Sequence, residues 1–213
     1  MHIPLVDILR CPRAHDDTWL VASIERAEAR DIIEGVLGCP ICSAEYPIRE
    51  GVVDFGEAPA AMPYVAPRED EAVRLAAALD LTEARTVALL DGAWGAHAPL
   101  IRSMSPAQLL LVNPPEGVPS GDGISVVRGR VAPLAAGSVN AAALDAVENG
   151  EMVASVVRAV RGGGRLLGPA GASIPEGFTE LVSDADVWVA GLAAGASVSA
   201  PVPLTRRPPS PSP

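Results

Sequence analysis

The apolar positions of residues 69–190 follow two spacings that alternate along the chain. Residues 69–80 and 150–160 carry apolar side chains at helical spacing, which predicts two amphipathic helices, and 96–104 suits a third. Short apolar runs predict strands at 87–90, 108–112, 124–128, 139–145 and 165–168, with a closing pair at 178–182 and 187–190. Strands that alternate with helices predict an α/β fold with a mostly parallel sheet.

The first 55 residues show a different pattern. Residues 4–10 suit one or two helical turns, and 19–24, 31–37 and 46–55 suit short strands with turns between them. A Pro/Ala-rich stretch without periodicity follows. We therefore expect a small domain at 1–56, a linker at 57–68, a larger Rossmann-like domain at 69–204 and a disordered Pro-rich tail at 205–213.

Charge and composition narrow the range of possible functions and partners. The formal net charge of −10 disfavours a phosphate backbone as a partner, so direct nucleic-acid binding is not favoured. The longest uncharged run, 187–205, is rich in Gly, Ala, Ser and Pro and lies at the short limit for crossing a bilayer, so no membrane span is expected. The first ten residues lack the apolar core of a signal peptide. Three cysteines, two of them in a C-x-x-C, favour a metal in a reducing, cytoplasmic compartment.

Two Cys-Pro knuckles lie before and after the first two predicted strands of the small domain. Cys11-Pro12 precedes them, and Cys39-Pro40-Ile41-Cys42 follows the second. Thiolates at C-x-x-C spacing can reach one tetrahedral ion, so Cys11, Cys39 and Cys42 predict a zinc site. A domain with so little core would gain folding free energy from the metal. The competing interpretation is a decayed site with three ordinary thiols.

The fourth ligand is less well defined by the sequence. The position at which a second C-x-x-C would place its last cysteine is Ala14. We predict His15, one residue further, as the substitute ligand, with Asp16 or Asp17 as the alternatives.

The knuckles belong to a longer pattern, L-x-x-I-L-x-C-P followed by G-x-L-x-C-P-x-C-x-x-x-Y-P-I-x-x-G. Over residues 5–55 this pattern resembles the small zinc-ribbon proteins that activate methyltransferases acting on tRNA, rRNA and release factors. The matching residues are Cys11, Pro12, Leu37, Cys39, Pro40, Cys42, Tyr46, Pro47, Ile48 and Gly51. The resemblance implies a zinc-ribbon-like domain that docks on a protein partner.

The run at 87–90 leads into a turn that carries Gly92 and Gly95, and a strand, glycine turn and helix typically open a nucleotide-binding unit. With the segment R-A-V-R-G-G-G-R-L-L at 158–167, the order of elements over 71–194 resembles class I S-adenosylmethionine-dependent methyltransferases. The resemblance implies S-adenosylmethionine at the carboxyl end of the strands, held by Gly92, Gly95, Asn113 and Arg130.

The departures from that family fall on the cofactor positions. Leu90 takes the place of the first acid and Trp94 that of the middle glycine. Asn113, Arg130 and Asn140 take the places of three further acids. A bulky indole and the loss of carboxylates that pair with ribose hydroxyls both disfavour the cofactor, while the strand cores stay apolar.

These observations predict a methyltransferase-like protein without catalytic residues that serves as a protein-binding or assembly subunit. The alternatives are an active methyltransferase with an atypical pocket, or a binder of another nucleotide or small ligand in the same crevice. No Ser-His-Asp arrangement is evident. We expect His97 to be a solvated surface residue, and Asp184 and Asp186 to form a turn between strands.

Overall fold

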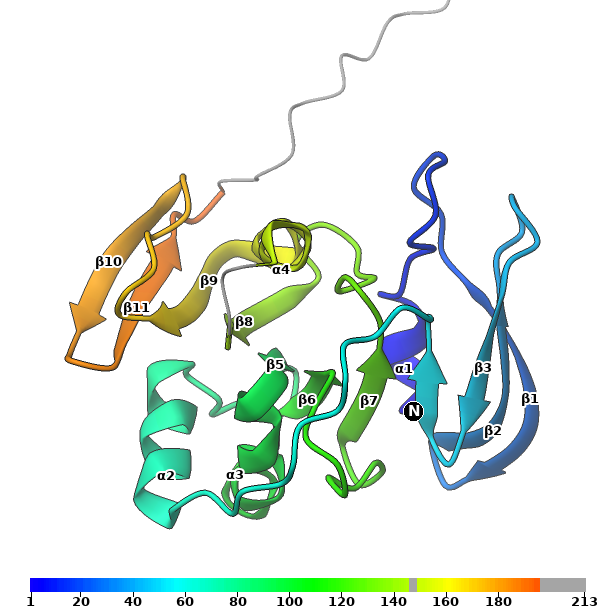
Figure 1. Ribbon diagram of the computed structural model, residues 1–213, viewed down its shortest axis with the longest axis horizontal. Coiled ribbons are helices and arrows are strands. Elements are labelled where there is room, and N and C mark those ends of the chain that lie inside the picture. Colours follow the sequence, from blue (N-terminus) through cyan, green and yellow to red (C-terminus); the bar gives the residue numbers. More distant parts are fainter. Residues whose placement is uncertain (146–148, 196–213) are drawn as a thin grey trace, which may run out of the picture.

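A computed structural model describes residues 1–145 and 149–195 of the chain. The predicted tail at 205–213 lies outside the described residues. All described strands join one eleven-stranded sheet in the order β1-β2-β3-β4-β7-β6-β5-β8-β9-β11-β10 (Figure 1). In the described ranges, no helix has the length and apolar character needed to cross a membrane.

The N-terminal part is a short helix followed by an antiparallel meander. It contains α1 (Ile3–Val6), β1 (Val21–Glu28), β2 (Asp31–Gly38), β3 (Glu45–Arg49) and β4 (Val52–Asp54). The strands confirm the predicted pattern, whereas the helix is shorter than the predicted 4–10.

The C-terminal part alternates strands and helices as predicted. Its elements are α2 (Glu69–Ala78), β5 (Val87–Asp91), the 3-10 helix η1 (Gly92–His97), α3 (Ala98–Met104), β6 (Gln108–Val112), β7 (Ile124–Arg128), β8 (Val139–Ala143), α4 (Gly150–Ala159), β9 (Val160–Pro169), β10 (Phe178–Ser183) and β11 (Val187–Leu192). Strands β7, β6, β5, β8 and β9 are parallel, and β11 pairs antiparallel with β9 and β10. The order reverses at β5, which is the topological switch point of a doubly wound fold.

The boundary between α4 and β9 differs from the prediction. The sequence predicts a helix at 150–160 and a strand at 165–168, but β9 begins at Val160, directly after α4. Gly164 allows this path because an added Cβ would lie 2.7 Å from the Asn140 carbonyl oxygen on β8.

The two parts meet through a strand pair. β4 pairs in parallel with β7, with Val52 opposite Val126 and Val53 opposite Val127. The amide of Phe55 extends the junction by donating to the Arg128 carbonyl at 2.8 Å. Because β3 and β7 occupy both edges of β4, the meander and the parallel sheet form one hydrogen-bonded unit.

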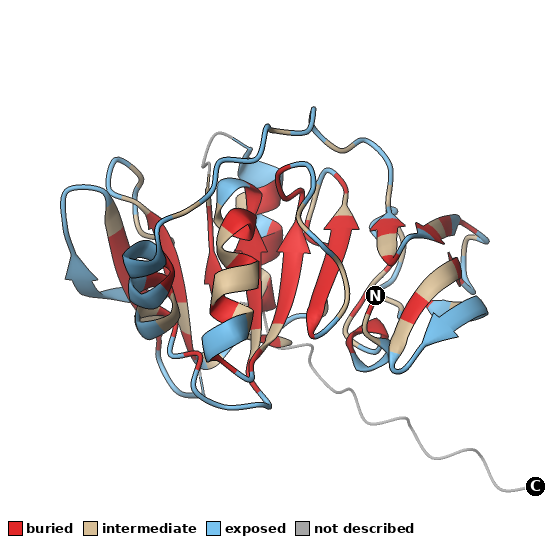
Figure 2. Cartoon of the chain, turned by 90° about the horizontal axis from the view of Figure 1, so that it is seen from below, coloured by how far each residue is buried: buried red, intermediate tan, exposed pale blue. Residues whose placement is uncertain are grey.

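The sheet separates two apolar cores. Helices α2 and α3 cover one face, where Leu75 and Ile101 pack with strand residues such as Leu111. The other face, covered by α4, continues into the N-terminal part. That second core includes Leu37, Cys39, Ile48, Leu110, Val127 and Val156. Burial is greatest along the parallel strands, and the outer strands β1 and β10 are exposed over most of their length (Figure 2).

Candidate functional site

Four side chains predicted as metal ligands converge beside the meander. Cys11 follows α1, Cys39 follows β2, Cys42 lies in the turn before β3, and His15 lies in the loop before β1. Each offers one ligand atom, and all four atoms lie within 4.8 Å of one another. The Sγ atoms of Cys11 and Cys42 are 3.8 Å apart, and Cys39 Sγ is 3.4 Å from His15 Nε2.

This geometry fits a tetrahedral zinc ion. Zinc–thiolate bonds of about 2.3 Å place two ligand atoms about 3.8 Å apart, close to the separations observed here. Three thiols and an imidazole are also a common structural donor set for zinc. The cluster could therefore bind zinc.

Electrostatics distinguish the buried thiols. Burial opposes ionisation of Cys39, but donation from the backbone of Cys42 and Ile41 outweighs it and lowers the thiol pKa to about 6. Burial raises the pKa of Cys11, whose Sγ lies 3.2 Å from the Tyr46 hydroxyl oxygen. Of these two buried thiols, Cys39 is the one whose ionised form the structure favours, and thiolates are the form that binds metal.

The structure places the side chain of His15, and of neither aspartate, beside the three thiols. Neither Asp16 nor Asp17 belongs to the cluster, which contains His15 instead. Asp16 contributes its carbonyl oxygen, which lies 2.7 Å from His15 Nδ1. A hydrogen bond at Nδ1 fixes the ring so that Nε2 faces the thiols, as is usual for metal-binding histidines.

We expect His15→Ala to lower zinc affinity by at least tenfold, whereas Asp16→Ala should leave it unchanged, because only the imidazole points at the thiols. Competition against a chromophoric zinc chelator measures both affinities. Equal affinities in the two variants would remove His15 from the site.

The glycine turn lies at the carboxyl end of β5, as predicted, but the chain's own side chains cover it. Gly92 has a positive φ of 57°, and an added Cβ would lie 2.4 Å from the Asp145 carboxylate. That carboxylate accepts a hydrogen bond from the Ala93 amide at 2.9 Å. At Gly95 an added Cβ would lie 2.6 Å from Pro114 Cβ. Both glycines therefore permit internal packing.

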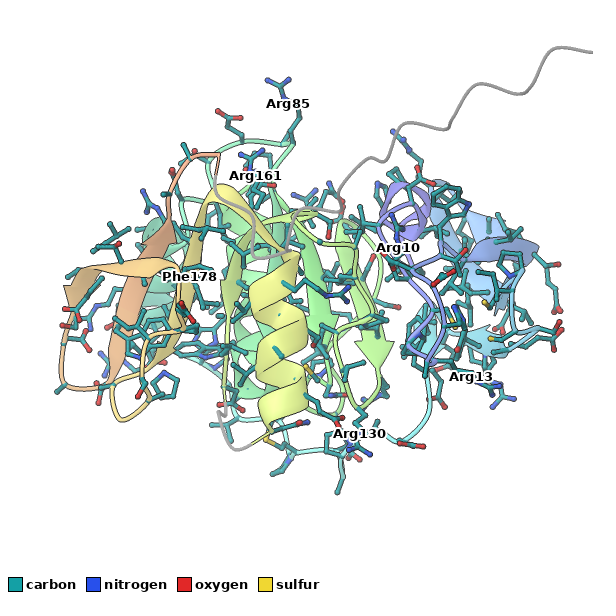
Figure 3. All side chains as sticks on the ribbon, turned by 90° about the horizontal axis from the view of Figure 1, so that it is seen from above. Arg10, Arg13, Arg85, Arg130, Arg161 and Phe178 are labelled. Carbon is teal, nitrogen blue, oxygen red and sulfur yellow. The ribbon has the colours of Figure 1, made fainter. Side chains whose placement is uncertain are left out.

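The two other predicted cofactor residues are also engaged elsewhere. The Asn113 side chain donates to the Gly129 carbonyl at 2.8 Å and accepts from the Gly129 amide at 3.0 Å, which ties the end of β6 to the end of β7. Arg130 lies on the outside of the molecule (Figure 3), where its guanidinium pairs with Glu151 at 2.7 Å and with Glu57 at 3.7 Å. The structure thus brings Gly92 and Gly95 into one turn, whereas the Arg130 guanidinium is held at the surface.

Two of the residues that the sequence analysis places at acid positions, Leu90 and Asn140, lie away from the crevice. Asn140 lies near the start of β8, where its side chain accepts from the Val87 amide at 3.0 Å, so it is at the opposite end of the strand from the crevice. Within the described ranges, Asp91 at the end of β5 and Asp145 after β8 are acids that lie at the glycine turn. The buried Leu90 packs in the core instead.

The turn and its flanks also carry a buried acid, Asp91, and two neighbouring rings, those of Trp94 and His97. Asp91 is only 7% exposed, and burial raises its pKa to about 6. The Trp94 indole donates to the Leu144 carbonyl at 3.0 Å and lies 5.5 Å from the His97 ring. The expectation that His97 is solvated is wrong: its ring is partly buried, Nδ1 has no hydrogen-bond partner among the described residues, and burial lowers its pKa.

The N-terminal part is similar in sequence to a known family. Residues 3–51 match the family model of Trm112p-like proteins. This Trm112p-like segment contains all four cluster residues and three of the four strands of the meander in full. No curated protein matches the chain.

Several solved structures resemble the chain in fold. MycE methyltransferase from the mycinamycin biosynthetic pathway has a TM-score of 0.47 at 13% identity, covering 68% of this chain and 53% of that one. A SAM-dependent O-methyltransferase from Thermotoga maritima has a TM-score of 0.43 at 12% identity, covering 76% and 78%. The [4+2]-cyclase SpnF has a TM-score of 0.38 at 15% identity, covering 55% and 56%. The matches to SpnF and to a geranyl diphosphate methyltransferase span about half of those chains (56% and 48%). The order of the parallel strands β7, β6, β5, β8 and β9 makes the fold Rossmann-like, and the zinc-ribbon-like segment precedes it in the chain.

Proposed function

We propose that this chain is a non-catalytic, methyltransferase-like protein that acts as a protein-binding or assembly subunit. The observation that carries this proposal is the closure of the glycine turn by Pro114 on Gly95 and by the Asp145 carboxylate on Gly92. In a working nucleotide site, glycines leave the backbone open to the ligand. Here the same backbone surface is packed against side chains, and the Ala93 amide already has an acceptor.

The proposal assigns the metal a structural role. Zinc bound by Cys11, His15, Cys39 and Cys42 would have all four positions filled by protein, which is typical of structural sites. The ion would fix the meander, and the meander would hold its place on the sheet through β4 and β7. The proposal keeps the predicted division of the chain into a zinc-binding domain at 1–56, a linker at 57–68 and a methyltransferase-like domain at 69–204.

The exposed edges of the sheet indicate where a protein partner could bind. The family resemblance implies docking by the zinc-ribbon domain, but the inner edge strand of that domain, β4, is already paired within the chain. The outer edges of the whole sheet are β1 and β10. Both expose apolar side chains: Val21 is 58% and Ile24 46% exposed on β1, and Leu181 is 58% and Val182 60% exposed on β10. Strand addition at such an edge is an established mode of protein recognition.

The proposal is tested by isothermal titration of S-adenosylmethionine and of its demethylated product into zinc-loaded protein. We expect no binding at millimolar ligand, because opening the turn would require displacing Pro114 and Asp145. Binding in the micromolar range would contradict the closed turn, and methyl transfer to a physiological substrate would end the proposal. With no binding, the next step is capture of a partner by the wild type in parallel with Val182→Arg and Ile24→Arg, one on each sheet edge.

The second candidate is an active S-adenosylmethionine-dependent methyltransferase with an atypical pocket. It is favoured by the position of the turn at the switch point and by two acids, Asp91 and Asp145, at that edge. Gly92, Gly95, Asn113 and Arg130 would then line the cofactor. In that case Gly95→Trp should abolish cofactor binding, and unchanged affinity in this variant would exclude the crevice.

A further inference from the structure

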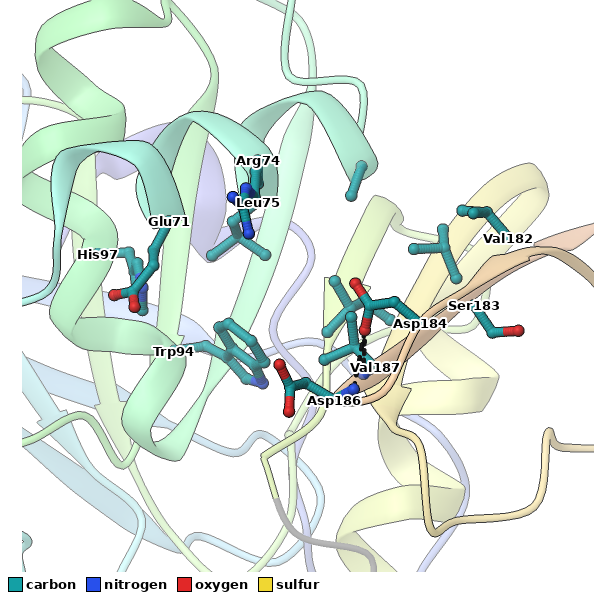
Figure 4. Close-up of a pocket in the computed structure, with 13 residues that line it drawn as sticks. Glu71, Arg74, Leu75, Trp94, His97, Val182, Ser183, Asp184, Asp186 and Val187 are labelled. Carbon is teal, nitrogen blue, oxygen red and sulfur yellow. Dashed lines mark hydrogen bonds between the residues drawn. The ribbon is translucent and has the colours of Figure 1, made fainter.

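A cavity of about 510 Å³ lies beside the glycine turn, between α2, η1 and the β10–β11 hairpin (Figure 4). The metal ligands do not line it. Of the four residues predicted to hold the cofactor, none contributes to its wall. It is therefore a separate feature, although Trp94 of the turn forms one side.

One part of the cavity wall is apolar. Leu75 of α2, Leu167 of β9 and Val189 of β11 are buried in the same core, and their side chains line the cavity. The Trp94 indole nitrogen is already bonded to the Leu144 carbonyl, so the ring is fixed and offers its apolar surface to the cavity. A ligand with a hydrocarbon body would bury apolar area here.

The polar part of the wall is acidic. Glu71, Asp184 and Asp186 line the cavity, and Arg74 is the cation among its lining residues. The Arg74 guanidinium lies 3.8 Å from the carboxylate of Asp70, a residue that does not line the cavity. His97, also in the wall, has its pKa lowered by burial, so its ring is neutral near pH 7. The wall thus carries a net negative charge.

The three acids differ in how they are engaged. The Asp184 carboxylate accepts from the amides of Asp186 and Val187, each at 2.9 Å, and thereby fixes the turn between β10 and β11. Glu71 accepts from the Arg68 amide at 3.0 Å. The Asp186 carboxylate has no hydrogen bond or ion pair within the described part of the chain, and it points into the cavity (Figure 4).

We propose that this cavity binds an organic cation, whose ammonium or guanidinium group contacts the Asp186 carboxylate and the Trp94 ring while its hydrocarbon part packs on Leu75, Leu167 and Val189. A free carboxylate and an aromatic face are complementary to a cation of this kind. The cation can belong to a small amine or to a lysine or arginine side chain of a protein. An anion would face the acids instead.

The test measures binding of two matched probe pairs to the zinc-loaded full chain. Benzyltrimethylammonium is compared with its neutral analogue neopentylbenzene, and a capped Ala-Ala-Lys-Ala-Ala peptide with the same peptide containing norleucine. We expect at least one cationic probe to bind about tenfold or more tightly than its neutral partner. If the peptide alone shows this preference, the cation comes from a protein, and if the free ammonium alone shows it, from a small molecule.

Variants locate the site. Asp186→Asn should weaken the cationic probe about fivefold or more and leave the neutral one unchanged, because it removes the charge and keeps the turn. Glu176→Gln is the matched control, since it removes one exposed charge outside the cavity wall, and its affinities should equal those of the wild type. The proposal is overturned if neither cation is preferred over its neutral partner, or if the two variants lose the preference equally.

Discussion

Cys39→Ser is expected to lose stoichiometric zinc and to destabilise the chain by several kcal/mol, the largest effect that we predict for a single substitution. Structural zinc sites contribute on the order of 10 kcal/mol of apparent binding free energy, whereas a whole domain is stable by only about 5–15 kcal/mol. Cys39 is 4% exposed and lies in the core that the meander shares with the parallel sheet. Metal analysis and urea denaturation of the purified variant measure the two effects.

The damage should extend beyond the zinc ligands because the meander and the sheet are joined. Loss of the meander would free the edge of β7, where Val126 and Val127 pair with β4. We therefore expect faster hydrogen exchange at β7 as well as at β2 and β3, both in Cys39→Ser and in the chelator-treated wild type. Asp16→Ala serves as the control. A variant that unfolds at the same urea concentration as the wild type would show that the cluster does not stabilise the fold.

Asp91→Asn is expected to stabilise the protein at pH 8 by up to about 3 kcal/mol. Burial raises the pKa of Asp91 to about 6 from the ordinary value of 3.8, so the ionised form is disfavoured in the folded state. Below about pH 3 the carboxyl group is largely protonated in both states and causes no penalty. Between pH 4 and 6 the folded state retains a proton that the unfolded state has lost, so stability falls as pH rises, and above pH 6 the full penalty applies.

Asparagine has the same shape and no charge, so it removes this dependence. The stability difference between Asp91→Asn and the wild type should be near zero at about pH 3 and largest at pH 7–8. Urea denaturation followed by tryptophan fluorescence at each pH measures it. Asp7→Asn, at an exposed position, is the matched control and should change stability little. A difference that is constant with pH would show that Asp91 does not carry a raised pKa.

The sequence alone determined the elements and much of the metal cluster. The apolar runs at 108–112 and 124–128 correctly predicted β6 and β7 with the same bounds. A buried parallel strand is a continuous apolar segment, so it can be predicted from the local sequence without knowledge of the strands that it pairs with. The cysteine spacing predicted a zinc-ribbon-like segment, because ligand geometry limits how far apart the ligands can lie in the chain. The structure then placed the imidazole of His15, one of three possible fourth ligands, beside the thiols.

Only the tertiary structure decided what surrounds the glycine turn. Pro114 lies on Gly95, and Asp145 contacts the backbone of Gly92 and Ala93 from more than fifty residues away, which no local pattern reveals. Asn140 was misplaced for the same reason: alignment along the sequence gives its position in a motif, whereas strand register places it at the far end of β8. The pairing of β4 with β7 likewise depends on backbone groups that every residue has. Side-chain type fixes local structure and candidate ligands, and contacts between distant segments decide whether a crevice is open.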